Sequence, residues 1–387
     1  MTSILSFATF GEIMSKIGNI LIAIVIFLFM ITVHELGHYT AGRLFKFKIN
    51  EFAVGFGPKI FSRKNIKRDE LFTIRLLPLG GACVFEGEDE ENPNAQAFNN
   101  QKPYKRIIVL IAGALFNLIS ALIIAVVAFS GFGEYMMTVQ KVETNSPNYG
   151  IFELGDVLVS VDGKDLYMIS DLSEIISKSG DTMTVKVLRP YEQYKKWITN
   201  ADGNSVLAVS VTSLKDGEQG DVIVLEGITK AVFQTETEEG TVSYTGWGIT
   251  RNYTAARVKT DFFPSIGKSF GYCFETGTLV IKTLGRLLTG AAGLDQIGGP
   301  ITTINIASQV VQSGLANVLF LIVLISVNLA VFNLLPLPAL DGSRVVFVLI
   351  EMIAGKPVNR NVESIIHMVG IVLLLGFAIL VDVLRWF

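Results

Sequence analysis

The chain has 387 residues and a formal net charge of −3; half of its residues are hydrophobic and only 17% are charged. Soluble domains carry about 25% charged residues, so this composition excludes a wholly soluble protein. The small net charge argues against nucleic-acid binding, and two cysteines are too few for a secreted disulfide scaffold. The composition therefore predicts an integral membrane protein with some soluble mass.

Four apolar segments are long enough to cross a bilayer, which takes about 20 mostly apolar residues. They cover approximately residues 17–40, 107–129, 315–340 and 365–384. The first segment does not look like a cleaved signal peptide, because its apolar run is too long and no small-residue cleavage site follows it. The sequence therefore predicts four transmembrane helices.

The first apolar segment ends in the stretch HELGH, which holds two of the three histidines of the chain. His34 and His38 are four residues apart and share one face of a helix, where both imidazoles can bind one zinc ion. Glu35 between them can take a proton from zinc-bound water. Ionisable side chains at membrane depth are costly and usually mark function, so we expect a zinc site rather than a plain helix end. His367, the third histidine, is expected to be an ordinary interfacial residue.

The loop that follows, residues 43–106, carries 12 Lys or Arg, and the loop between the last two segments carries three more. The positive-inside rule places both loops in the cytoplasm. Both termini and residues 131–314 are then expected outside. Cys83 and Cys273 would lie on opposite sides of the membrane, which excludes a disulfide between them.

Strand-like patterns occur on both sides of the membrane. In the inner loop, EFAVGFGPKIF and LFTIRLLPLGGACVF flank a charged stretch and predict a β-hairpin. In the outer region, residues 139–189 alternate short strands with one helix-like stretch, which predicts a small α+β domain. Residues 190–250 either complete this domain or form an insertion in it. Residues 264–289 predict helices that lie on the outer face of the membrane.

The third apolar segment ends in NLLPLPALDG. A catalytic zinc usually has three protein ligands and an open fourth position, so HELGH needs one further ligand. Pro336 and Pro338 break the helix just before Asp341. A broken helix at membrane depth is tolerated where it lines a cavity, and the break could direct Asp341 toward the zinc. The alternative is that Asp341 only caps the next short helix.

Five pieces of the chain follow the order found in the site-2 protease family of intramembrane zinc metalloproteases: HELGH, LPLGGACVF, AGALFN, GGPI and SVNLAVFNLLPLPALDG. The chain resembles the bacterial RseP/RasP-like branch of this family, which carries a PDZ domain. The resemblance implies zinc ligation by His34, His38 and Asp341 and a catalytic role for Glu35. It also implies roles for two asparagines and for the inner hairpin. The residues concerned are Asn328 at the oxyanion and Asn333, Leu79, Gly80 and Gly81 at the substrate.

The resemblance further implies a polytopic α-helical membrane protein with four transmembrane helices, an inner β-hairpin and an extracytoplasmic PDZ-like α+β domain. The expected domains are residues 1–130, 131–255, 256–314 and 315–387. In this family the PDZ domain either binds peptides or excludes bulky substrates. The expected location is the bacterial cell membrane, with the active site near the cytoplasmic face. Expected partners are single-pass membrane proteins already shortened by a site-1-type protease, such as anti-sigma factors or remnant signal peptides, and not nucleic acids.

The expected reaction is peptide hydrolysis, in which zinc lowers the pKa of a bound water toward about 7 and Glu35 transfers its proton to the leaving amine. One alternative is a zinc-binding membrane scaffold that presents peptides through its PDZ domain without cutting them. Glu35 favours the protease, because a scaffold needs no acid/base between its ligands. A second alternative is a zinc or ion transporter. The PDZ-like domain and the single metal constellation argue against it.

Overall fold

The computed structural model describes residues 10–384, except 89, 91, 171, 201, 202, 238, 239 and 292–297. The chain divides into two compact units. Unit 1 comprises Met1–Ile124 and Thr276–Phe387, and unit 2 comprises Ala125–Glu275. Unit 2 is thus inserted between two halves of unit 1.

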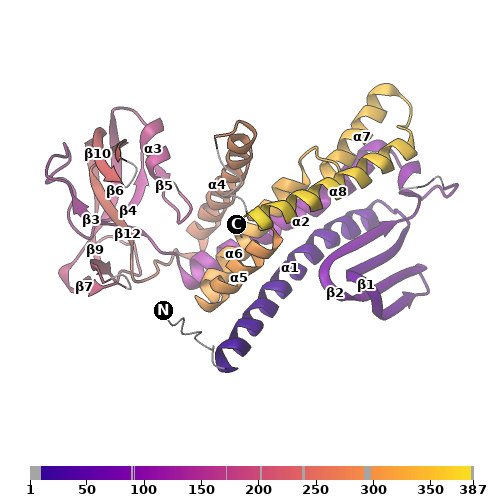
Figure 1. Ribbon diagram of the computed structural model, residues 1–387, viewed down its shortest axis with the longest axis horizontal. Helices are drawn as coiled ribbons and strands as arrows, with labels where there is room; N and C mark the ends of the chain where they lie inside the picture. Colours follow the sequence, from indigo (N-terminus) through magenta and orange to yellow (C-terminus); the bar gives the residue numbers. More distant parts are fainter. Residues whose placement is uncertain are drawn as a thin grey trace, which may run out of the picture. The chain divides into compact units, whose positions relative to one another are not determined.

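The described chain contains four helices long and apolar enough to cross a membrane, as the sequence predicts (Figure 1). These helices are α1 (Phe10–Leu44), α2 (Pro103–Val127, continued by a π-helical turn over Ala128–Phe132), α6 (Leu315–Asn333) and α8 (Arg360–Leu384). The third span ends at Asn333 rather than near residue 340. The reason is the pair Pro336 and Pro338, which cannot continue a helix.

Three further helices have mixed polar and apolar faces: α4 (Phe262–Leu288), α5 (Pro300–Gln312) and α7 (Asp341–Ala354). Helix α4 is one continuous helix where the sequence predicted several. Helix α5 begins at the GGPI motif and packs against α1, α6 and α8. The carboxylate of Asp382 on α8 accepts hydrogen bonds from the backbone N–H groups of Ile301 and Thr302. Asp382 therefore satisfies two donors that the first turn of α5 leaves unpaired.

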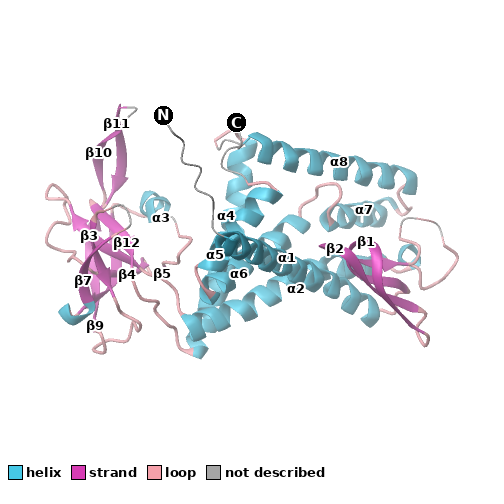
Figure 2. Ribbon diagram, turned by 60° about the horizontal axis from the view of Figure 1, so that its bottom comes forward, coloured by secondary structure: helices cyan, strands magenta, loops and turns pink. Residues whose placement is uncertain are grey.

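The inner hairpin consists of two long antiparallel strands, β1 (Ile49–Asn65) and β2 (Glu70–Phe85), beside α1 (Figure 2). Both strands bend, so residues 51–54 pair with 71–74 on one side and with 81–84 on the other. Residues 81–84 thereby form an edge of this sheet. Gly80 lies at the bend of β2 with a φ of +93°, and a Cβ there would overlap the ring of Phe56. Only glycine fits this position.

Unit 2 is built on a six-stranded sheet with the order β12-β3-β4-β6-β9, in which β5 pairs with β4. Its strands are β3 (Met137–Val142), β4 (Val157–Val161), β5 (Lys164–Asp165), β6 (Thr182–Pro190), β9 (Gly220–Thr229) and β12 (Ile249–Tyr253). Helix α3 (Leu172–Lys178) adds Leu172 and Ile176 to a core that also buries Leu158, Val187 and Trp247. The sheet and helix are consistent with the predicted PDZ-like domain.

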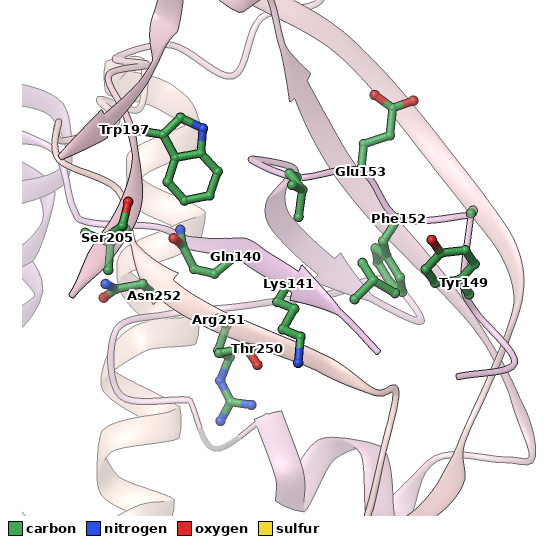
Figure 3. Close-up of a pocket in the computed structure, with 14 residues that line it drawn as sticks. Gln140, Lys141, Tyr149, Phe152, Glu153, Trp197, Ser205, Thr250, Arg251 and Asn252 are labelled. Carbon is green, nitrogen blue, oxygen red and sulfur yellow. The ribbon is translucent and has the colours of Figure 1, made fainter. Parts of the chain in front are cut away.

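Residues 190–250 both complete this domain and enlarge it. Strand β9 adds to the sheet, and two hairpins stand apart from it. The hairpins are β7–β8 (Lys195–Thr199 and Ser205–Val209) and β10–β11 (Ala231–Thr237 and Gly240–Gly246). A cleft of about 830 Å³ is lined by Trp197 of β7, Gln140 and Lys141 of β3, and Arg251 of β12 (Figure 3).

Candidate metal centre

His34 and His38 lie one turn apart on α1 and are buried against α2. The two helices approach closely here because both carry glycine at the contact. A Cβ on Gly113 of α2 would lie 2.4 Å from Nε2 of His38, and one on Gly37 would lie 2.3 Å from the carbonyl oxygen of Ala112. The glycines therefore make room for both imidazole rings between the helices.

Asp341 is the first residue of α7 and follows the irregular loop 334–340. Ala339 in this loop has a φ of +78°, a conformation that costs energy in a non-glycine residue. Its backbone N–H donates to Nδ1 of His367 on α8 at 3.1 Å. His367, expected to be an ordinary interfacial residue, thus contacts the loop that presents Asp341.

Asp341 and the two histidines bring three ligand atoms together, as the sequence predicts. Oδ2 of Asp341 lies 2.9 Å from Nε2 of His34 and 3.3 Å from Nε2 of His38, and the two nitrogens are 3.1 Å apart. Zinc bonds of about 2.0–2.2 Å in a tetrahedron separate neighbouring ligands by about 3.3–3.6 Å. Two of the three separations are a few tenths of an ångström shorter than this, so small side-chain shifts would place the three atoms at three corners of a tetrahedral zinc site and leave the fourth corner open.

The described polar contacts of the Asp341 carboxylate at this centre are with the two histidines. Within the described part of the chain no Lys or Arg forms an ion pair with it.

The sequence model of peptidase family M50 matches residues 22–377, a range that contains all three ligand candidates. The chain belongs to peptidase family M50. Its relatives include proteins named "putative zinc metalloprotease" from three bacteria. The protein of Clostridium perfringens is 32% identical over 369 residues, which cover 94% of this chain and 97% of the relative. The protein of Fusobacterium nucleatum is 28% identical over 94% of this chain and 97% of its own, and that of Nostoc is 29% identical over 93% and 94%.

Membership of M50 makes the chain a zinc metalloprotease, an endopeptidase whose cofactor is zinc. It is also a multi-pass membrane protein with four candidate spans. The predicted enzyme class and cofactor are thereby confirmed. The non-proteolytic scaffold and the transporter are set aside.

The edge of the inner sheet lies against Glu35 of this M50 chain. Oε2 of Glu35 accepts a hydrogen bond from the backbone N–H of Cys83 at 2.8 Å, and a Cβ on Gly81 would lie 3.1 Å from Cγ of Glu35. Gly80 precedes this contact at the bend of β2. The side chain of Leu79 lies outside what the structure describes. Three of the four predicted substrate contacts, including Leu79, thus lie on the strand that touches Glu35.

The two asparagines of α6 that were predicted to belong to the site, Asn328 and Asn333, differ in their contacts with the centre. Nδ2 of Asn333 lies 3.5 Å from both ring nitrogens of His34. Asn328, five residues earlier, is half-buried, and among the described residues no hydrogen bond joins it to the histidines or to Asp341.

Two contacts of α2 with the histidines have no counterpart in the sequence analysis. Nδ1 of His38 donates to the carbonyl oxygen of Val109 at 2.8 Å, and the side-chain amide of Asn117 lies 3.3 Å from Nδ1 of His34. A backbone carbonyl leaves no trace in a sequence. Asn117 does leave one, since it is a polar residue within the apolar segment AGALFN.

Proposed function

We propose that this M50 enzyme cleaves peptide bonds within the transmembrane segments of single-pass membrane proteins. The supporting observation is that the ligand candidates lie on, or close to, helices long and apolar enough to cross a membrane. His34 and His38 lie within the span Met14–Leu44, and Asp341 follows the span that ends at Asn333. A centre formed by membrane-spanning helices meets its substrates in the bilayer.

In this proposal His34 and His38 bind zinc through Nε2, and Asp341 binds it through a carboxylate oxygen. When bound, zinc supplies a water of lowered pKa and a Lewis acid for the substrate carbonyl. Glu35 accepts the proton of that water and delivers it to the leaving amine nitrogen. Asn328 donates to the oxygen on which negative charge develops, and Asn333 orients the substrate beside His34.

The inner sheet is proposed to hold the substrate in an extended form. A transmembrane helix must unwind before cleavage, and its released backbone groups need partners at membrane depth. An edge strand supplies such partners by pairing with an extended peptide. Residues 81–84 form that edge, and Cys83 already touches Glu35. We assign substrate pairing to this edge, which includes Gly81, and to the backbone of Leu79 and Gly80 directly before it.

We also propose an orientation and a cellular setting. The 12 positive charges of residues 43–106 favour a cytoplasmic location for the inner sheet and the metal centre. The enzyme would then span a bacterial cell membrane, with unit 2 and both termini on the outer side. There the PDZ-like domain of an RseP/RasP-like enzyme would bind or exclude substrates, such as anti-sigma factors or remnant signal peptides, after an upstream site-1-type protease has shortened them.

The direct test is cleavage of a purified single-pass substrate by the enzyme in detergent. A fragment cut within the transmembrane segment should form, disappear on addition of a metal chelator and return on addition of zinc. The same bond in a soluble peptide without an apolar segment should be cut far more slowly. Cleavage only outside the transmembrane segment would overturn the proposal.

A further inference from the structure

Asn117 is a fully buried polar side chain in a membrane-spanning helix. It lies one turn beyond Gly113 and therefore on the face of α2 that meets the histidines. Its Nδ2 is placed 3.3 Å from Nδ1 of His34, whereas its Oδ1 has no hydrogen-bond partner among the described residues. A buried acceptor without a partner is destabilising, so the orientation of this amide calls for an explanation.

The hydrogen bonding of His38 indicates a role for the Asn117 amide. His38 donates its Nδ1 proton to the carbonyl of Val109, which leaves the lone pair of Nε2 directed at His34 and Asp341. Metal-binding histidines almost always donate their second ring nitrogen in this way. His34 also directs Nε2 at the centre and has Asn117 at Nδ1. The amide oxygen and nitrogen of asparagine exchange places by a half-turn of the side chain.

We infer that Asn117 is a positioning residue for His34, whose Nδ1 proton it accepts with Oδ1 so that Nε2 is held as the zinc-binding nitrogen. The half-turn places an acceptor oxygen of Asn117, rather than its amide donor, opposite the Nδ1 proton of His34. The inference rests on the proposed zinc ligation by His34. It extends the site from three ligands to the groups that orient two of them, Asn117 and the carbonyl of Val109.

The test measures the zinc affinity of the purified full chain in detergent by competition with a chromophoric chelator. Asn117→Leu has nearly the same size but no acceptor, and it should weaken zinc binding about 10–100-fold. Asn117→Asp keeps an acceptor oxygen and should stay within a few-fold of the wild type. A merely structural asparagine would not give this difference between Leu and Asp.

Asn19→Leu is the matched control, since it makes the same change on α1 about 22 Å along the helix from His34, and it should leave zinc affinity unchanged. Thermal unfolding of the zinc-free variants checks their fold, and Asn117→Ala replaces the Leu variant if Leu does not fit. Wild-type affinity in Asn117→Leu, or equal weakening in the Leu and Asp variants, overturns the inference. Undiminished zinc binding in His34→Ala would instead overturn the proposed ligand set. This variant therefore distinguishes a failure of the inference about Asn117 from a failure of the proposed zinc ligation.

Discussion

The metal centre of unit 1 and the Asp156–Arg189 pair of unit 2 each hold a carboxylate away from most of the solvent, yet the partners of the two carboxylates differ. Asp156 is fully buried, and Arg189 donates to both of its oxygens at 2.9 Å. Arg189 also donates to Glu153 at 2.7 Å. The hydrogen bond from Arg189 to Asp156, together with the nearby negative charges, raises the pKa of the guanidinium despite its partial burial. In unit 2, therefore, the chain supplies the cation itself.

At Asp341 the partners are two imidazoles that present nitrogens to the same point, and these are groups that bind a metal as electron-pair donors. Burial alone does not decide which site is catalytic, because the more deeply buried carboxylate is that of Asp156, with 0% of its side chain exposed against 21% for Asp341. The distinction is whether the chain's own side chains balance the charge. A buried group of ligands that lacks a cation of the chain is expected to receive one from solution. The following substitutions test whether the first site is catalytic and the second structural.

The largest effect is expected at Glu35. Glu35→Gln keeps the shape of the side chain but cannot accept a proton, and general acid/base catalysis contributes about 10²–10⁴-fold to a rate. Cleavage should fall by at least that factor while zinc content and substrate binding remain, so uncut substrate should co-purify with the variant. A variant that cuts at the wild-type rate would show that Glu35 is not the base.

The second effect concerns the stability of unit 2. Asp156→Asn leaves Arg189 without its main partner and should destabilise the protein by about 3 kcal/mol, the low end for a broken buried pair, because Glu153 still pairs with Arg189. Asp181→Asn removes a carboxylate whose side chain is 98% exposed and should have almost no effect. Thermal unfolding of the full chain measures both. If Asp156→Asn lost zinc without losing stability, the structural role assigned to this pair would be wrong.

A smaller effect is expected where the backbone holds Glu35. Cys83→Pro removes the N–H that donates to Glu35, whereas Cys83→Ala keeps it. Proline is tolerated in an edge strand where the N–H points away from the sheet. A hydrogen bond to a charged group contributes about 1.5–3 kcal/mol, so kcat should fall about tenfold or more in the proline variant only. Equal kcat in both variants would show that the N–H of Cys83 does not contribute to catalysis.

Much of the membrane unit could be predicted from the sequence, because hydropathy and length alone define a span. The meeting of the three candidate ligands could also be predicted, since His34 and His38 share a helix face and the prolines before Asp341 indicate a break in the helix. The bend at Gly80 was not predicted, because alternation of side chains indicates a strand but not where it turns back on its partner.

The contacts of the groups around the candidate ligands could not be predicted, for a different reason. The amide of Cys83, the carbonyl of Val109 and the contact of His367 with Ala339 depend on how helices and strands pack, and backbone groups occur at every position. In unit 2, the pattern of residues 190–250 left open whether they complete the domain or form an insertion, and the structure divides them between sheet strands and hairpins. Both kinds of segment show the same polar, glycine-rich alternation.

The zinc content of the purified protein tests the central claim most directly. It is measured by elemental analysis in the wild type and in variants of both sites. The wild type and Asp156→Asn should each hold about one zinc per chain, and His34→Ala, His38→Ala and Asp341→Ala should each lose it. Retention of zinc at the wild-type level in Asp341→Ala would contradict the assignment of the third ligand and the contrast between Asp341 and Asp156.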